Sequence, residues 1–138
     1  MFRILIIEEH EKIQKSLVRA FKQEGLESCE GVIWDQADEL LRKNTYDLIV
    51  VDFDTEHHDT SILMNQLKVT NSMAEIIVLT SQSRFSHDQK YDAYDCILKP
   101  FKLCDVVNKG KKALEKKQLV DKVRSLEKII GSKKFAFL

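Results

Sequence analysis

The sequence contains little proline, glycine or cysteine. Its 138 residues include 1 proline, 4 glycines and 3 cysteines. This scarcity of proline and glycine excludes collagen-like chains and Pro/Gly-rich disordered chains. The cysteines Cys29, Cys96 and Cys104 show no CxxC spacing, so neither a zinc site nor a disulfide framework is indicated.

Long hydrophobic runs are also missing. The longest apolar runs span about four residues, as at 4–7 and 48–51, whereas a transmembrane helix needs about 20. Glu8 and Glu9 follow the start of the chain too soon for the apolar core of a signal peptide. We therefore expect a cytoplasmic protein that does not contact a membrane.

Charge is balanced overall but unevenly distributed. The 22 basic and 22 acidic residues cancel, and 43% of the residues are hydrophobic, enough for one domain with a sizeable core. Residues 1–107 carry 12 basic and 19 acidic side chains, whereas residues 108–138 carry 10 basic and 3 acidic ones. An acidic body followed by a basic tail indicates a change of role near residues 109–112.

Four short apolar segments predict strands. They cover residues 4–7, 48–51, 76–79 and 96–98, and they do not alternate with polar residues. Such segments are typical of strands buried on both faces of a sheet. A weaker candidate strand lies at residues 31–33.

Helical patterns separate these segments. A second helix is expected to be capped by Asp35, and a third to begin at Asp59 or Thr60. The residues expected to face inward are Ile13, Leu17, Ala20 and Phe21 in the first helix and Ile62, Leu63 and Leu67 in the third. The alternation of strands and helices predicts a parallel sheet with helices on both faces, a doubly wound α/β domain that ends near residues 107–113.

Polar residues follow the predicted strands: Glu8 and Glu9, then Asp52, Thr80 and Lys99. Ligands of open α/β sheets bind beyond the carboxyl ends of the strands. Carboxylates there can hold Mg²⁺, and an aspartate can itself accept a phosphoryl group. A hydroxyl and a lysine can bind phosphoryl oxygens. The set predicts phosphoryl chemistry, against the alternative that each residue merely ends a strand.

Together, these segments resemble the receiver domain of two-component response regulators over about residues 3–115. Residues 4–9 look like the first strand with its acidic pair, and residues 48–52 look like the strand that ends in the phosphoacceptor aspartate. Residues 78–81 match the strand that ends in the switch Thr/Ser, and residues 98–101 match the Lys-Pro-Phe segment. The resemblance implies a five-stranded flavodoxin-like sheet in the order 2-1-3-4-5 and a cis Lys99–Pro100 bond.

The resemblance also implies roles for the site residues. Asp52 would accept a phosphoryl group from a sensor histidine kinase, and Thr80 and Lys99 would bind that group. Mg²⁺ would be held by Glu8, Glu9, Asp52 and the backbone carbonyl of Asp54. The chain would then be a signalling domain with a transcriptional output rather than an enzyme.

The chain departs from the family pattern at several places. The acidic pair consists of two glutamates, and residues 53–60 lack the usual Met-Pro pair and glycine. Cys96 occupies the aromatic switch position, with Tyr94 nearby, and the segment from Thr80 to Lys99 is short by about one helical turn. The polar helix expected at residues 84–93 lies in that segment. These departures favour a second hypothesis, a phosphorylation-independent, receiver-like protein-binding module.

Other chemistries fit parts of the sequence. Asp52 and Asp54 resemble the nucleophile and the acid/base of haloacid-dehalogenase-type phosphatases, although the downstream acidic motif of that family is not evident. A metal cluster of Asp54, His57, His58 and Asp59 competes with a simple solvated loop, which we favour. Cys96 is expected to be small apolar filling rather than a redox sensor. The lysine-rich tail is expected to be a solvated helix face rather than a nucleic-acid site.

The C-terminal segment predicts one long helix that begins after Phe101 and runs to about Ile130, interrupted only at Gly110. Val106, Val107 and Ala113 should pack on the sheet. Leu119, Val123, Leu126 and Ile130 then recur at 4-3-4 spacing, the pattern of a short coiled coil. We expect a parallel homodimer through residues 117–130; the alternative is a helix that folds back on its own domain.

We therefore divide the chain into a receiver domain at residues 1–115 and a helical linker at residues 116–138. Residues 129–132 weakly resemble the junction between a receiver and an AAA+ transcription activator, and the apolar residues 135–138 suggest truncation within a longer protein. DNA contact is expected only through such an absent output domain.

Overall fold

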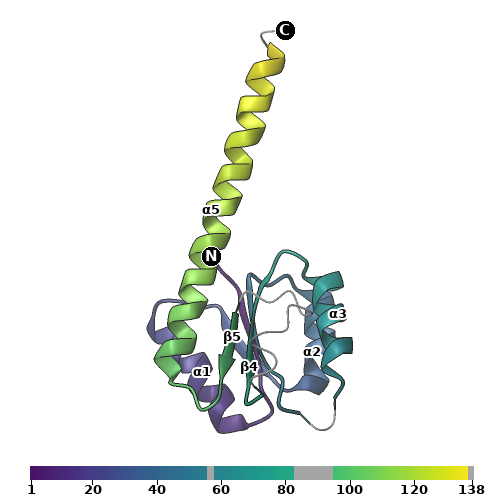
Figure 1. Ribbon diagram of the computed structural model, residues 1–138, viewed down its shortest axis with the longest axis vertical. Coiled ribbons are helices and arrows are strands. Elements are labelled where there is room, and N and C mark those ends of the chain that lie inside the picture. The colour runs from purple at the N-terminus through teal and green to yellow at the C-terminus, as the bar shows by residue number, and fades with distance from the viewer. Residues whose placement is uncertain (56–57, 83–94, 137–138) are drawn as a thin grey trace.

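Five parallel strands form the centre of the protein, as a computed structural model that describes residues 1–55, 58–82 and 95–136 shows (Figure 1). The strands are β1 (Ile4–Ile7), β2 (Cys29–Val32), β3 (Leu48–Asp52), β4 (Glu75–Thr80) and β5 (Asp95–Leu98). Their order is β2-β1-β3-β4-β5. The predicted flavodoxin-like fold and strand order are confirmed, and the weak second strand begins two residues earlier than expected.

Helices cover both faces of the sheet. They are α1 (Glu11–Gln23), α2 (Trp34–Lys43), α3 (Thr60–Thr70) and α5 (Leu103–Ala136). Figure 1 shows α1 and α5 on one face and α2 and α3 on the other. The helix predicted at residues 84–93, together with Tyr94 and His57, lies outside the described residues.

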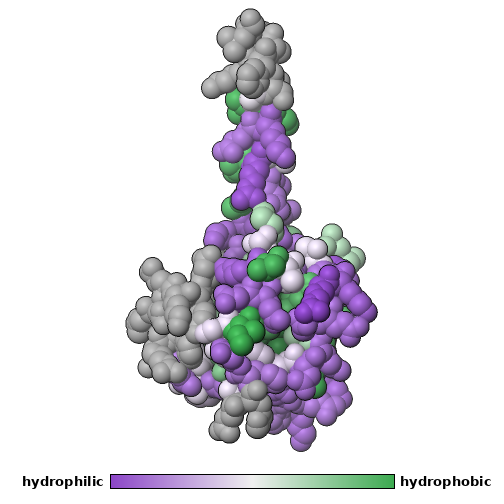
Figure 2. All heavy atoms as spheres, turned by 90° about the vertical axis from the view of Figure 1, so that its right-hand side faces the viewer, coloured by the Kyte–Doolittle hydropathy of each residue, from purple (hydrophilic) through white to green (hydrophobic). Residues whose placement is uncertain are grey.

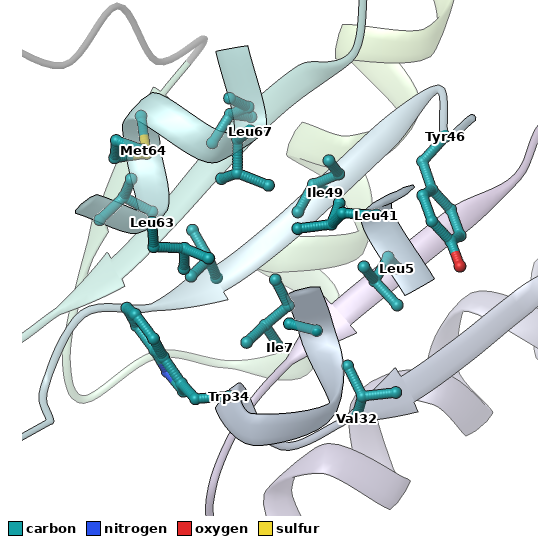
Figure 3. Packing of buried hydrophobic residues seen from close by; sticks show 14 of the residues in the cluster. Leu5, Ile7, Val32, Trp34, Leu41, Tyr46, Ile49, Leu63, Met64 and Leu67 are labelled. Atoms are coloured by element: carbon teal, nitrogen blue, oxygen red, sulfur yellow. The ribbon is translucent and has the colours of Figure 1, made fainter. Parts of the chain in front are cut away.

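The sheet divides the core into two layers. Leu5, Ile7 and Ile49 pack against α2 and α3 together with Trp34 and Leu67 (Figure 3). On the opposite face, the alternate residues of the same strands pack against α1 and α5; these include Ile4, Ile6, Leu48 and Val50, with Leu17, Phe21, Val106 and Ala113 from the helices. Because β1 and β3 are covered on both sides, their sequences are apolar without alternation.

Two helix predictions were wrong in detail. Asp35 does not cap α2, because the helix already begins at Trp34 and Asp35 lies in its first turn. Ile62 does not face inward: its side chain is 59% exposed. Its neighbours one turn on, Asn65 and Gln66, are polar, so the inward face of α3 is formed by Leu63, Met64 and Leu67. Asp59 caps α3 as expected, accepting from Ser61 N at 2.9 Å.

Helix α5 is continuous through Gly110, where an interruption was predicted. The absence of a side chain there lets the helix lie close to α1, because a Cβ on Gly110 would come within 2.7 Å of the Phe21 ring and 3.0 Å of Leu48. Val106, Val107 and Ala113 are buried as predicted. The helix then projects away from the domain, so the alternative that it folds back is wrong (Figure 1).

The projecting part of α5 leaves apolar side chains uncovered. Leu119, Val123, Leu126 and Ile130 are 51–62% exposed. Figure 2 shows green, hydrophobic patches between purple, hydrophilic ones along this projecting part, residues 117–130, which we call the stalk. Within the described part of the chain, no helix combines the length and apolar character needed to cross a bilayer.

Candidate functional site

The hydrogen-bond ladders of the sheet place the site residues at one edge. Glu8 N donates to Val32 O at 3.0 Å, one residue beyond β1, and Lys99 N donates to Thr80 O at 2.9 Å, one residue beyond β5. In register, Asp52 at the end of β3 is paired with Leu79, next to Thr80 at the end of β4. The carboxyl edge of the sheet thus brings Glu8, Asp52, Thr80 and Lys99 together. The Lys99–Pro100 bond is cis, as the family resemblance implied.

Asp52 and Lys99 form the central contact of the site. Lys99 Nζ lies 2.9 Å from Asp52 Oδ1, and the Asp52 side chain is 8% exposed. Burial alone would lower the pKa of Lys99, but the carboxylates of Asp52 and Asp54 outweigh burial and raise it. Lys99 therefore stays charged and compensates for the acidic residues around it.

Glu8 is buried beside Asp52. Burial, reinforced by the Asp52 carboxylate and opposed by Lys99, raises the pKa of Glu8 to about 8. Its Oε2 atom is buried and has no hydrogen-bond partner among the described residues. The Glu8 backbone carbonyl is held from α1, where Gln14 Nε2 donates to it at 2.9 Å. Without a cation, Glu8 therefore retains a proton at neutral pH.

Asp54 lies on the other side of Asp52 and faces β4. Its carboxylate accepts hydrogen bonds from Thr80 Oγ1 at 2.9 Å and from Ser81 N at 2.9 and 3.2 Å, and Lys99 Nζ lies 3.2 Å away. Partial burial would raise the pKa of Asp54, but these hydrogen bonds lower it below the ordinary value. Asp54 is thus an ionised member of the site, with its side chain directed at Thr80.

The side chain of Glu9 contacts the start of α2. Its Oε1 atom accepts from Trp34 N at 2.9 Å, supplying a negative charge at a helix N-terminus. His58 Nε2 lies 3.9 Å from the same oxygen, and the His58 ring stacks on Trp34 with the centroids 5.1 Å apart. The predicted metal ligand Glu9 therefore contacts the N-terminus of α2 and His58 in this structure.

The remaining edge residues fit a divalent cation of the Mg²⁺ type. Such a cation prefers oxygen ligands and one or two carboxylates. Glu8 and Asp52 supply two buried carboxyl groups, and the unpartnered Oε2 of Glu8 is an oxygen for which a cation would provide the missing partner. Loss of the Glu8 proton would accompany binding.

The described members of the alternative metal cluster in the loop after β3 are directed to different partners, and His57 lies outside the described residues. Asp54 faces Thr80, His58 stacks on Trp34, and Asp59 caps α3. Among the described residues, no three His, Cys, Asp or Glu side chains are grouped to hold a metal. Cys96 packs against the core, and burial raises the pKa of its thiol, which agrees with a filling role.

Two contributors to the site were not predicted. The Ser81 backbone N–H donates to the Asp54 carboxylate. Ser81 directly follows the predicted switch residue Thr80, and this position at the strand end could have indicated its role. Gln14, which holds the Glu8 carbonyl from α1, lies six residues away on a helix, and the apolar pattern of that helix carries no signal for it.

The fold and this edge define an α/β domain with a buried aspartate, a lysine and a hydroxyl at the carboxyl ends of its strands. The family model of the response regulator receiver domain matches residues 4–111. The chain therefore belongs to the response regulator receiver domain family. A comparison with curated proteins gave no significant match.

Several solved receiver domains are similar in structure. The receiver domain of the Francisella response regulator 1452 has a TM-score of 0.70 at 20% identity, covering 84% of this chain and 98% of the other. The beryllofluoride-activated NtrC4 receiver domain dimer has a TM-score of 0.75 at 22% identity, covering 85% and 99%. TrrA from Thermotoga maritima, in complex with Mg²⁺ and BeF, has a TM-score of 0.67 at 23% identity, covering 82% and 99%. At these identities the likeness concerns the fold.

Proposed function

We propose that the chain is a phospho-accepting receiver domain in which Asp52 takes a phosphoryl group from a sensor histidine kinase. The observation that carries the proposal is the contact of Asp52 with Lys99 at 2.9 Å, at the edge of the sheet where Glu8 and Thr80 also lie. A buried carboxylate held by an ammonium, with a hydroxyl on the adjacent strand, suits an acceptor of an anionic group.

The transfer is a displacement at phosphorus. An Asp52 carboxylate oxygen forms the new P–O bond while the P–N bond to the kinase imidazole breaks, and the imidazole leaves with its electron pair. Lys99 and Thr80 bind the oxygens of the transferred phosphoryl group. Because Thr80 ends β4, its movement toward that group would alter the end of this strand. Mg²⁺, held by Glu8, Asp52 and the Asp54 carbonyl, would neutralise charge on those oxygens. The chain itself would turn over no separate substrate.

Phosphorylation with a small-molecule donor tests this function directly. The chain is incubated with acetyl phosphate and Mg²⁺, and its intact mass is measured. We expect a gain of one phosphoryl group that is absent in Asp52→Asn. No gain in the natural chain, or an equal gain in Asp52→Asn, would exclude Asp52 as the acceptor.

The position of Glu9 favours a second candidate, a receiver-like binding module that works without phosphorylation. Glu9 Oε1 accepts a hydrogen bond from the N-terminus of α2, and this contact competes with the metal-ligand role that the family resemblance implied for Glu9. A magnesium titration separates the two candidates. Shifts of the amides around Asp52 in millimolar Mg²⁺ support the phospho-accepting domain, and a complete lack of response supports the binding module.

The projecting part of α5 is proposed to connect and pair receiver domains. Its exposed apolar positions favour a parallel homodimer through residues 117–130, with residues 116–138 serving as a linker toward a transcriptional output domain. Contact with DNA would then occur only through that output domain. A cytoplasmic location is part of the same proposal, because kinase and output meet there.

A further inference from the structure

The donors that a phosphoryl group on Asp52 would need are already bound to one carboxylate. Thr80 Oγ1, Ser81 N and Lys99 Nζ all lie 2.9–3.2 Å from the oxygens of Asp54. They represent three kinds of donor, a hydroxyl, a backbone amide and an ammonium, and they come from the ends of two neighbouring strands. A carboxylate and a phosphoryl group present similar anionic oxygens to such donors.

The turn after β3 directs Asp54 into this position. Phe53 is buried and its N–H donates to Leu79 O at 2.9 Å, which extends the ladder beyond the strand. Asp54 N then donates to Asp52 Oδ1 at 2.9 Å, and Thr55 N donates to Phe53 O at 3.0 Å. The backbone therefore curls around the Asp52 carboxylate and turns the side chain of Asp54 across the end of β4.

We infer that Asp54 is an internal occupant of the phosphoryl-binding site. This inference rests on the proposed function and adds a residue that controls it. Because an anionic phosphoryl group and the Asp54 carboxylate cannot share the same donors without repulsion, Asp54 must leave before the transferred group can bind Thr80, Ser81 and Lys99. In the unphosphorylated chain, the hydrogen bond with Asp54 keeps the Thr80 hydroxyl directed at the site.

The occupancy has two measurable consequences. Phosphorylation of the natural chain is slowed, because the open site is a minor state. The environment of the Ser81 amide in the unphosphorylated chain already reflects a bound anion. Asp54→Ala removes the occupant, whereas Asp54→Asn keeps an acceptor oxygen for Thr80 and Ser81 but loses the charge that faces Lys99.

The test compares the full chain with Asp54→Ala, Asp54→Asn and Asp35→Asn. Asp35→Asn removes one negative charge from an exposed side chain near the same edge and serves as the matched control. Two quantities are measured: the rate of phosphoryl uptake from acetyl phosphate and Mg²⁺ by intact mass, and the Ser81 amide shift without a donor. We expect Asp54→Ala to take up phosphoryl groups about tenfold faster, as for a site that is open about a tenth of the time.

The Ser81 amide should move upfield in Asp54→Ala, less so in Asp54→Asn, and not in Asp35→Asn. A rate in Asp54→Ala equal to or below that of the natural chain would overturn the inference while leaving Asp52 as the acceptor. If no variant takes up a phosphoryl group, the proposed function fails instead. The Ser81 amide then decides alone: a shift in Asp54→Ala supports Asp54 as the bound anion, and an unmoved amide overturns it.

Discussion

At the scale of single residues, the site is governed by how its charges are compensated. The carboxyl groups of Glu8 and Asp52 act on one another, and Lys99 contacts both Asp52 and Asp54. Asp54 stays ionised because donors surround it, whereas buried Glu8 keeps a proton. Around Asp52, the same edge thus contains a neutral acid, an ionised carboxylate and an ammonium.

The raised pKa of Glu8 predicts a dependence of stability on pH. In the unfolded chain Glu8 ionises near its ordinary value of 4.5, and in the folded protein near pH 8. The native state therefore binds more protons between these values, so its free energy of unfolding falls as the pH rises through this window. Glu8→Gln should remove on the order of 2 kcal/mol of that fall.

Urea unfolding in EDTA at pH 5.5 and pH 8 measures this effect. Glu27→Gln is the matched control, since Glu27 is exposed in the loop after α1. A fall in stability that is equally steep in Glu8→Gln and in the natural chain would show that another group is responsible.

Lys99 is predicted to be necessary for the stability of the acidic edge. Lys99→Met keeps the length of the side chain but leaves Asp52 and Asp54 without their shared cation. Because the Asp52 side chain is largely buried, we expect a loss of about 1–3 kcal/mol in the free energy of unfolding. Lys109→Met, which breaks a more exposed pair with Asp95, should cost at most about 1 kcal/mol. Equal losses in chemical denaturation of the two variants would contradict this account.

At the scale of elements, the apolar pattern of the sequence predicted the strands whose position depends on burial. The runs at residues 4–7, 48–51 and 76–79 became central strands because both faces of the sheet are covered. The polar residues at the ends of these strands lie at one edge of the sheet, because the carboxyl ends of parallel strands meet at the same edge. The sequence could not predict that Glu9 binds the α2 N-terminus or that Asp54 turns toward Thr80, because these choices depend on contacts between loops distant along the chain.

Gly110 shows the same limit within a helix. Its low helix propensity suggested an interruption, but the close packing of Phe21 on α5 decides the outcome. We predict that Gly110→Ala lowers the free energy of unfolding by about 1–2 kcal/mol, because overpacking against the Phe21 ring exceeds the gain in propensity.

Gly131 offers a control in the same helix. A Cβ there meets no atom within 4 Å, so Gly131→Ala carries no steric cost. The substitution should stabilise the helix by up to about 1 kcal/mol. Circular dichroism during thermal unfolding measures both variants. Stabilisation by Gly110→Ala would show that α1 and α5 can separate without loss.

At the scale of the whole molecule, an acidic domain carries a projecting helix. Helix α5 connects the domain to the stalk without a break. The helix packs on the sheet through Val106 and Ala113 and then extends away from it (Figure 1). Lys117 Nζ, 2.7 Å from Asp47 Oδ1, is an ion pair near the point of departure. A change at the site that alters the packing of α5 on the sheet would therefore act on the stalk through the same continuous helix.

The stalk predicts a parallel dimer. A segment as short as residues 117–130, about 21 Å of helix, is marginal alone in water, but here it extends a helix that is already formed on the domain. Leu119 and Leu126 occupy d positions, and Val123 and Ile130 occupy a positions, all of them exposed. Lys122 and Glu127 fall at g and e, where opposite charges of two parallel chains can pair.

Sedimentation at tens of micromolar should accordingly show a dimer of the intact chain. Leu126→Glu should dissociate it, because the substitution puts a charge into the seam, whereas Ser125→Glu adds the same charge at a c position and should not. The parallel orientation is tested by Leu119→Cys: these residues meet across the seam only when the two helices run in the same direction, so oxidation should then link the chains. A monomer at this concentration would reduce the stalk to a connector, and a dimer that survives Leu126→Glu would place the interface on the domain itself.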